Sequence, residues 1–364
     1  DYYASRGLGD VYKRQSFTRN INEDLRRRDF TVNAMAYNAE YGLVDPYGGK
    51  NDLKDKIIRC VGNPDTRFNE DALRILRALR FASVYGFSIE ENTSKSIFKN
   101  ADLLKNIATE RVISEFLKLI CGKDAVKILD AYRETIAVII PEITVMFNFN
   151  QNNIHHSYDL WQHTLTALGT IEPNPILRMT MLLHDIGKPS VKTTDNSGQS
   201  HFQGHQLESK KIADKILHRL RLPSDFINKT LLLIEYHDVR FNGSKKLMKK
   251  VMNVLGTDLT KQLLEVEYAD ISAQSEYQRE EKFGYLKTAK THLNEIIKDN
   301  ECFKLSQLDI NGKDVLNLGV KEGRDVGNIL DYLLMLVVDA NVPNKKSILI
   351  SKAKEYIYGN QINK

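Results

Sequence analysis

The side chains best suited to metal chemistry are concentrated in one segment of the sequence. All of the nine histidines except His292 lie between residues 155 and 237. Within this segment, the apolar stretch LRMTMLLHDIGKP contains the adjacent residues His184 and Asp185. Divalent metals that activate water take imidazole and carboxylate ligands and keep positions open for substrate. The segment therefore indicates a centre in which a metal activates water.

The other candidate ligands lie on separate predicted helices. His163 occurs in WQHTLTAL, and Asp270 occurs in YADISAQ on a late helix. Adjacent side chains on a helix diverge by roughly 100°, so His184 and Asp185 either bridge two metals or divide binding and orienting between them. The remaining ligands must then come from other helices, as in helix bundles. A single histidine such as His155 is more often structural, whereas an HD pair between an apolar helix and Gly-Lys-Pro favours a metal site.

A second group of reactive side chains lies in the segment NEDALRILRALRF. Helical spacing places four of its residues on one face, namely Glu70, Arg74, Arg77 and Phe81. Asp71 lies beside this face. Cytosine and adenine both present an exocyclic amine donor next to a ring-nitrogen acceptor. Asp71 as acceptor beside Arg74 as donor would match that pair, whereas uracil and guanine present the opposite order. Taken alone, the segment is more typical of a surface helix with intrahelical salt bridges.

Composition limits the class of protein. The 364 residues and 41.7 kDa predict two to three domains at ~150 residues per domain. A net charge of +5 and a pI of 8.8 give a mild preference for polyanions. The 3 cysteines are far apart and form no CxxC pair, which disfavours a disulfide scaffold and fits a reducing cytoplasm. No apolar run approaches the ~18 residues that span a bilayer, so we expect no membrane-spanning helix.

Periodicity predicts a mainly α protein. A short strand pair is expected over residues 30–46, followed by a helix from about Asn69 that stops at a glycine. The Asn-rich segment 145–157 is the best linker candidate. Further helices are expected at 109–122, 123–138, 158–171, 175–187, 206–221, 225–237, 245–255, 258–275, 327–338 and 346–358.

The ordered motifs of residues 22–120 resemble the bacterial tRNA nucleotidyltransferase (CCA-adding enzyme) and poly(A) polymerase family. RRDFTVNAMA resembles its RRDFT-type motif, VDPYGG its D-P-x-G segment, EDALR its EDxxR nucleotide-selecting motif, and ATERV a later ER segment. DINGKDVLNLGVKEGRDVGNILDYLL resembles the tail of the family. The resemblance implies Mg²⁺-dependent transfer of CMP and AMP from CTP and ATP to a tRNA 3′ end. It also implies nucleotide binding by Arg28, Asp29, Glu70, Asp71, Arg74 and Arg77, with Arg28 and Arg77 near phosphates.

The segments LLHDIGKP, HFQGH and YHD resemble, in that order, the HD superfamily of metal-dependent phosphohydrolases. This resemblance implies a catalytic dyad of His184 and Asp185 and a divalent metal bound by His163, His184, Asp185 and Asp270. His205 and His237 would then supply a second metal or a phosphate contact. Lys188 lies close enough in sequence to meet a substrate phosphate, or it stabilises the C-terminal end of a helix.

The resemblance predicts the domain organisation, and the sequence departs from the family pattern at one place. We expect a non-native leader (1–15), the remnant of a nucleotidyltransferase head (16–62), a helical neck (63–145), an all-α HD domain (155–275) and a helical tail (276–364). The polymerase carboxylates of the family lie in GGxxRD and DxD segments, which residues 1–27 do not contain; Asp10 in GLGD is a lone acid.

Because these carboxylates are absent from the chain, we expect it not to incorporate CMP or AMP into tRNA. Two alternatives stay open at this point. One is an HD phosphohydrolase that acts on nucleotide or RNA-end phosphates, and the other is a non-catalytic RNA-binding fragment.

Overall fold

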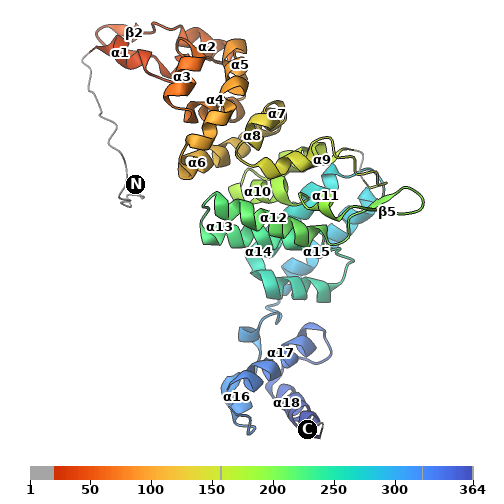
Figure 1. Ribbon diagram of the computed structural model, residues 1–364. Helices are drawn as coiled ribbons and strands as arrows, with labels where there is room; N and C mark the ends of the chain where they lie inside the picture. Colours follow the sequence, from red (N-terminus) through yellow and green to blue (C-terminus); the bar gives the residue numbers. More distant parts are fainter. Residues whose placement is uncertain (1–19, 156–157, 322, 363–364) are drawn as a thin grey trace. The chain divides into compact units, whose positions relative to one another are not determined.

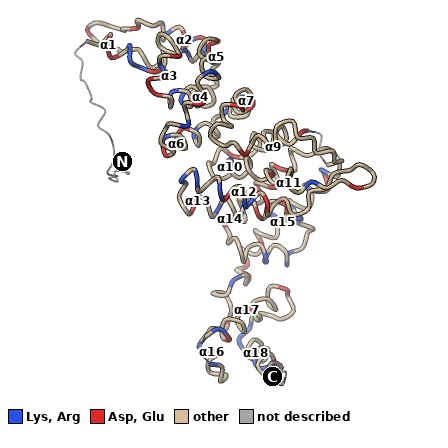
Figure 2. Tube along the Cα trace, viewed as in Figure 1, with Lys and Arg blue, Asp and Glu red and all other residues tan. Residues whose placement is uncertain are grey.

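The computed structural model describes residues 20–155, 158–321 and 323–362, and the predicted leader with Asp10 lies outside them. The chain divides into two compact units, residues 1–139 and 140–364. Both units consist mainly of helices, which confirms the expected fold class (Figure 1). Basic and acidic residues are interspersed along both units (Figure 2). Within the described residues, no helix combines the length and apolar character needed to cross a membrane.

The first unit consists of short helices and two small sheets. Its helices are α1 (Ile21–Arg26), α2 (Gly49–Asp55), α3 (Pro64–Glu70), α4 (Leu73–Tyr85), α5 (Glu91–Asn100), α6 (Thr109–Ile120), α7 (Ala125–Ala131) and α8 (Arg133–Ala137). Antiparallel β1 (Ala36–Asn38) and β2 (Gly42–Val44) form one sheet, and parallel β3 (Ile57–Ile58) and β4 (Ser88–Ile89) form the other. The expected helix at 109–122 is confirmed, whereas the one at 123–138 is divided into α7 and α8.

The predicted strand pair begins later than expected. Residues Thr31–Asn33 form a 3₁₀ helix, and only Ala36–Asn38 pairs with the second strand. The Thr31 hydroxyl donates to Asp52 at 2.6 Å, and the Asn33 amide donates to Asp29 at 3.1 Å. These side-chain hydrogen bonds hold the backbone in a turn, and they override the apolar alternation on which the prediction of a strand depended.

The single helix predicted from Asn69 is two helices that meet at Asp71. Asp71 is extended, with φ −154° and ψ 100°, and its Oδ1 accepts a hydrogen bond at 3.2 Å from the backbone N–H of Leu73. A short acidic side chain in this conformation satisfies an unpaired N–H at the start of a helix. The predicted stop is confirmed at Gly86, whose φ of 67° is unfavourable for residues with a Cβ.

Asp65, in the first turn of α3, ties this helix to α5. Its carboxylate accepts hydrogen bonds from Lys99, Ser96 and Asn100, which lower its pKa from 3.8 to about 2. Because the folded-state pKa lies below the unfolded value, the stabilisation is present above about pH 4 and is lost as the pH falls through about 2.

We therefore expect the urea midpoint of the parent to fall between pH 5 and pH 2 more steeply than that of Asp65→Asn. Equal slopes for the two proteins would contradict this assignment. The exposed carboxylate of Asp102, which pairs with Lys105, provides the control variant Asp102→Asn.

The second unit opens with a helical bundle. It contains the 3₁₀ helix η3 (Pro141–Met146), α9 (Leu160–Thr170), α10 (Pro175–Leu183), α11 (Lys188–Val191), a hairpin of β5 (Thr193–Thr194) and β6 (Ser200–His201), α12 (His205–Arg219), α13 (Ser224–Tyr236), α14 (Lys245–Ala273) and α15 (Arg279–Lys298). The helices expected at 158–171, 175–187, 206–221 and 225–237 are confirmed within a few residues. Helices α9, α10, α13 and α14 pack against one another.

The helices expected at 245–255 and 258–275 are confirmed as the two parts of α14, which meet at a kink where Gly256 is non-helical, with φ 70° and ψ 176°. Helix α15 was not expected, although its buried residues Leu286, Ala289, Leu293 and Ile296 follow helical spacing.

Residues 145–155, the described part of the segment predicted to be a linker, make side-chain contacts within the second unit. The buried side chain of Gln151 accepts a hydrogen bond from Lys188 at 3.1 Å, and the Asn153 amide donates to the Ser200 carbonyl at 2.7 Å. Asparagine and glutamine side chains form these specific contacts as readily as they occupy loops, so their abundance misidentified the segment.

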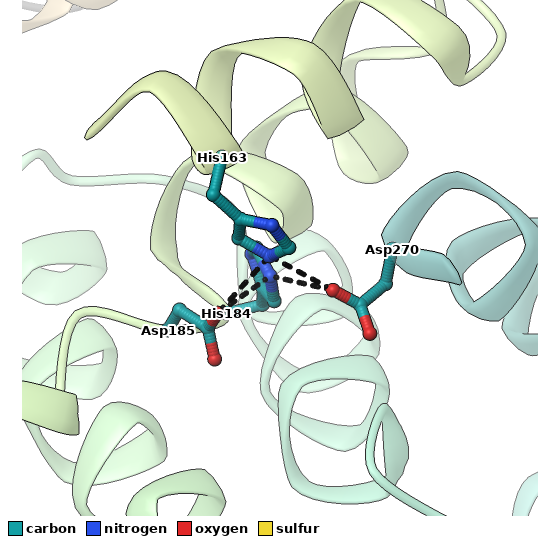
Figure 3. A group of neighbouring side chains, drawn as sticks. All are labelled: His163, His184, Asp185 and Asp270. Carbon is teal, nitrogen blue, oxygen red and sulfur yellow. Dashed lines mark ion pairs between the residues drawn. The ribbon is translucent and has the colours of Figure 1, made fainter. Parts of the chain in front are cut away.

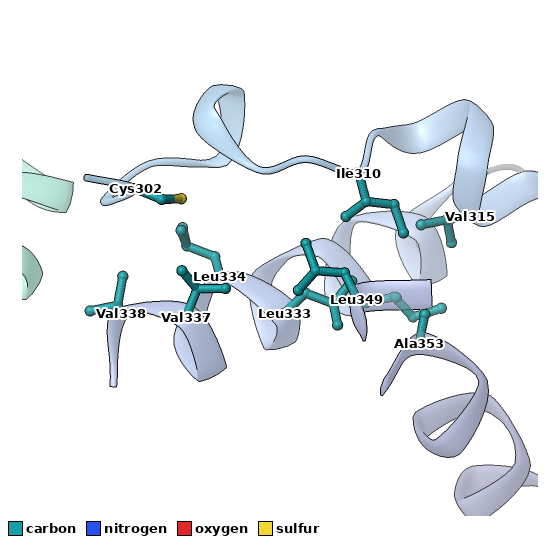
Figure 4. Close-up of a cluster of buried hydrophobic side chains, with 10 residues drawn as sticks. Cys302, Ile310, Val315, Leu333, Leu334, Val337, Val338, Leu349 and Ala353 are labelled. Atoms are coloured by element: carbon teal, nitrogen blue, oxygen red, sulfur yellow. The ribbon is translucent and has the colours of Figure 1, made fainter. Parts of the chain in front are cut away.

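The C-terminal part of the second unit has an apolar core of its own. It contains 3₁₀ helix η4 (Leu305–Gln307), α16 (Gly312–Leu316), α17 (Arg324–Val338) and α18 (Lys346–Ile362). Val315 from α16, Leu333 from α17 and Leu349 from α18 are fully buried in it (Figure 4). Because this cluster joins all three helices, the two helices predicted at 327–338 and 346–358 have a core against which to pack.

Candidate nucleotide pocket and candidate metal centre

A cavity of about 540 Å³ in the first unit collects the arginine-rich motifs. It is lined by Arg27, Arg28, Asp29, Asn33, Asp71, Leu73, Arg74, Arg77, Phe81 and Arg111. These residues come from the end of α1 and the following loop, the junction of α3 and α4, one face of α4, and α6. Five arginines face two aspartates in this list, so the cavity suits an anionic ligand that also presents hydrogen-bond donors.

An ion pair between Asp29 and Arg77 joins the RRD motif to α4. Arg77 donates to Asp29 Oδ2 through Nε at 2.7 Å and through Nη2 at 2.6 Å. The other oxygen of Asp29 accepts from the backbone N–H of Phe30 and from Asn33. Asp29 is buried, whereas Arg77 is 34% exposed. The carboxylate therefore orients the guanidinium group at the wall of the cavity.

A second network orients Asp71 and Arg74. Arg111 donates to Asp71 Oδ2 at 2.9 Å, while the other oxygen of Asp71 caps α4. Arg74 donates to Glu70 at 2.8 Å and to the carbonyl oxygens of Arg67 and Arg27 at 3.1 and 2.9 Å. Both side chains are therefore held in place from the protein side and present their remaining hydrogen-bonding capacity to the cavity.

The structure brings most of the predicted nucleotide-binding residues together. Arg28, Asp29, Asp71, Arg74 and Arg77 line the cavity, and Arg28 also pairs with Asp24. Glu70 does not line the cavity. Its carboxylate pairs with Arg67 and Arg74, so it helps to orient the Arg74 side chain. The prediction omitted the lining residues Arg27, Asn33 and Arg111, although RRDFTVNAMA and ATERV contain all three.

In the second unit, six predicted side chains converge from five helices or from the residues directly after them. His163 lies on α9, His184 and Asp185 follow the end of α10, His205 begins α12, His237 follows α13, and Asp270 lies on α14. Helix α10 starts at Pro175 after a capping Asn174 and is buried on nearly every side. Its C-terminal end therefore delivers His184 and Asp185 into the interior, where both are at most 1% exposed.

The ligand atoms form two groups that share Asp185. Asp185 Oδ2 lies 3.3 Å from His163 Nε2 and 3.2 Å from His184 Nε2 (Figure 3). Asp270 Oδ1 completes this group at 2.9 Å from His163 Nε2 and 3.5 Å from His184 Nε2. Asp185 Oδ1 lies 3.2 Å from His205 Nε2 and 3.5 Å from His237 Nε2. Within each group the atoms lie within 4.8 Å of one another.

The four imidazoles share one hydrogen-bonding pattern, in which Nδ1 faces a backbone carbonyl. These contacts join His163 to Ala273 at 3.2 Å, His184 to Met181 at 2.7 Å, His205 to Phe202 at 2.9 Å and His237 to Ile234 at 2.6 Å. A carbonyl oxygen only accepts, so Nδ1 carries a proton, and in its neutral form each ring presents a lone pair at Nε2.

The Nε2 lone pairs lie so close to one another and to the carboxylates that a cation is needed to offset their repulsion. His205 Nε2 and His237 Nε2 lie only 3.2 Å apart, and the buried Nε2 of His184 faces the carboxylates of Asp185 and Asp270 at 3.2 and 3.5 Å. Two neutral imidazoles with facing lone pairs repel each other, as do imidazole lone pairs and carboxylates. The donor set of four imidazole nitrogens and two carboxylates therefore fits divalent metals.

The charges of these buried side chains lead to the same conclusion. Burial opposes protonation of His184, but the charge and hydrogen bonding of Asp185 and Asp270 outweigh it and raise its pKa to about 10. Burial would raise the pKa of both carboxyl groups, yet the neighbouring cationic groups hold each pKa well below its usual range. The carboxylates thus demand compensating positive charge.

Lys188 is part of the centre and does not sit at the end of a long helix. It is 5% exposed, its Nζ lies 2.6 Å from Asp185 Oδ2, and it donates to Gln151. It begins the four-residue helix α11, so stabilisation of a helix C-terminus does not account for it. A buried ammonium beside a metal-binding carboxylate is also suitable for contact with a phosphate.

Three family descriptions match successive parts of the chain. Residues 6–59 match the poly(A) polymerase head domain, and residues 86–147 match the RNA- and SrmB-binding site of polymerase A. Residues 205–353 match domain 2 of tRNA nucleotidyltransferases. The first match begins within the predicted leader, and the third crosses the predicted boundary between HD domain and tail. The finer domain limits stay a prediction.

Curated relatives are tRNA nucleotidyltransferases. A CCA-adding enzyme of Ligilactobacillus salivarius is 30% identical over 94% of this chain and 73% of its own length. An A-adding tRNA nucleotidyltransferase of Deinococcus radiodurans is 31% identical over 86% of this chain and 74% of its own length. The match to a CCA-adding enzyme of Anoxybacillus flavithermus is 46% identical but spans only 39% of this chain and 36% of that enzyme.

Solved structures have the same fold. The CCA-adding enzyme of Bacillus stearothermophilus in complex with CTP matches 96% of this chain and 78% of its own, with a TM-score of 0.65 and 24% identity. The Thermotoga maritima CCA-adding enzyme in complex with tRNA matches 92% and 74%, with a TM-score of 0.51 and 22% identity. The sequence match across nearly the whole chain, together with this fold, shows that the chain belongs to the tRNA nucleotidyltransferase family that includes the CCA-adding enzymes.

Proposed function

We propose that the cavity of the first unit binds CTP and ATP, and that the whole protein transfers CMP and AMP from them to the 3′ end of tRNA. The observation that supports this most strongly is that Asp71 and Arg74 both line a cavity rich in arginine. The tRNA partner is supported by the relatives that act on tRNA and by the structure of a relative with tRNA bound. The Mg²⁺ that phosphoryl transfer requires stays a prediction for the whole protein.

Base selection would follow from what each group offers. Asp71 accepts hydrogen bonds, which suits the exocyclic amine of cytosine or adenine, and Arg74 donates, which suits the adjacent ring nitrogen. Arg28 and Arg77 would contact the triphosphate. Arg111 and Glu70 would act indirectly, since each holds one member of the selecting pair.

This proposal predicts a binding preference that Asp71 controls. We expect the parent to bind CTP and ATP roughly 10–100 times more tightly than UTP and GTP, because a good bidentate pair contributes about 1–3 kcal/mol of discrimination. Asp71→Asn retains the oxygen that caps α4 but places a donor amide at the base, so the preference should collapse. Equilibrium binding of the four nucleotides measures this without requiring turnover. The control is Asp102→Asn, and an unchanged preference in Asp71→Asn would contradict the proposal.

The second unit supports a second candidate function, metal-dependent hydrolysis of nucleotide or RNA-end phosphates. The supporting observation is the convergence of four imidazole lone pairs and two carboxylates in a buried centre. His163, His184, Asp185 and Asp270 would hold one metal, and His205, His237 and Asp185 a second. When bound, such metals lower the pKa of water and polarise a phosphoryl oxygen. Lys188 would orient Asp185 and attract the phosphate.

A further inference from the structure

The C-terminal end of α14 contacts two of the candidate metal ligands, which come from different helices. The carbonyl of Ala273 accepts the Nδ1 proton of His163 at 3.2 Å. One residue later, Gln274 donates from Nε2 to Asp270 Oδ2 at 2.7 Å. Hydrogen-bond partners of this kind set the orientation and basicity of metal ligands.

The two oxygens of Asp270 have different surroundings. Oδ1 faces His163 Nε2 and His184 Nε2 at 2.9 and 3.5 Å, whereas Oδ2 is the atom that Gln274 holds. A donor on Oδ2 fixes rotation of the carboxylate and leaves Oδ1 directed at the centre. Since Asp270 is 15% exposed and His163 is fully buried, the carboxylate is the member of the pair that needs such restraint.

Lys282 determines which way round the Gln274 amide lies. Its Nζ donates to Gln274 Oε1 at 2.5 Å from the first turn of α15. An ammonium group only donates, so the amide oxygen must face Lys282 and the amide nitrogen must face Asp270. Arg279 additionally donates to the Gln274 backbone carbonyl at 3.2 Å, which fixes the main chain. Lys282 therefore fixes the orientation of the Gln274 amide, and the amide in turn fixes the orientation of the Asp270 carboxylate.

We propose that Gln274, held by Lys282, is a positioning residue for Asp270 in the metal centre, and that the start of α15 thereby controls metal affinity. The proposal rests on the metal centre put forward above. It assigns a role to two residues that contribute no ligand atom themselves.

The test is calorimetric titration of the whole chain with Mn²⁺. Gln274→Met keeps the length of the side chain but removes the donor, and we expect about 10- to 100-fold weaker binding. Lys282→Met should weaken binding less, because the amide is then free to turn, and Lys282→Arg should restore it. Lys287→Met, the same change at an exposed position on α15, is the matched control and should bind as the parent does.

The outcomes separate this proposal from the metal centre itself. Thermal unfolding of the metal-free variants should match the parent, which distinguishes positioning from general destabilisation. Mn²⁺ binding by Gln274→Met within twofold of the parent would overturn the positioning role alone. A parent chain that binds none of Mn²⁺, Co²⁺ or Zn²⁺ would overturn the metal centre and this proposal together.

Discussion

Asp185→Asn is expected to reduce Mn²⁺ affinity by more than 100-fold and to remove any metal-dependent phosphohydrolase activity. Asp185 is the one residue that both ligand groups share, with Oδ2 directed at one and Oδ1 at the other. Changes outside the ligand shell already cost about 10- to 100-fold in metal affinity, so neutralising a shared ligand should cost more. The variant is almost the same size as the parent side chain, which limits the change in packing.

The measurements for this variant are Mn²⁺ titration and hydrolysis of a 2′,3′-cyclic nucleotide. Asp195→Asn is a matched control, since Asp195 also pairs with a histidine, His201, at 2.7 Å but lies on the surface. Parental metal affinity and parental hydrolysis in Asp185→Asn would show that the convergent histidines and carboxylates serve a structural role only.

Arg77→Ala is expected to impair both nucleotide binding and stability. The change leaves the buried carboxylate of Asp29 without the guanidinium group that donates to it twice. Removing one partner of a fully buried pair costs about 3–5 kcal/mol. Because Arg77 is 34% exposed, we expect about 1–3 kcal/mol in the free energy of unfolding. Loss of a phosphate contact should also weaken CTP and ATP binding by at least about tenfold.

A double-mutant cycle separates the two effects of Arg77. Asp29→Asn combined with Arg77→Ala should recover part of the stability, since no uncompensated charge remains, but it should not recover nucleotide binding. Arg133→Ala, at an arginine of similar exposure outside the cavity, is the control. Nucleotide affinity that is unchanged in Arg77→Ala would exclude this wall of the cavity from nucleotide binding.

Sequence patterns predicted the mainly helical fold because apolar spacing and helix stop signals are local. Gly86 illustrates this: a glycine after an apolar repeat suffices to end α4. Asp71 illustrates the limit, since a helical pattern runs through it while its side chain caps a new helix. Helix α15 could have been predicted, because Leu286, Ala289, Leu293 and Ile296 have helical spacing.

The sequence predicted which residue types form the candidate sites, but it did not predict which other side chains contact and orient them. The histidine and aspartate pattern predicted the six side chains that converge in the candidate metal centre, because each has the chemistry of a ligand. It did not indicate Gln274 or Lys282, whose role depends on the turn between α14 and α15. Arg111 was similarly missed because it reaches Asp71 from 40 residues along the chain.

The break at Asp71 limits the substitutions that could change the proposed nucleotide preference. Any residue at this position must accept the N–H of Leu73 to start α4, and only a few short polar side chains do this well. The same residue lines the cavity and receives Arg111. A mutation here that changes the proposed base preference must therefore also keep a cap for α4, as Asn would, so the repertoire open to evolution or to a protein engineer is narrow.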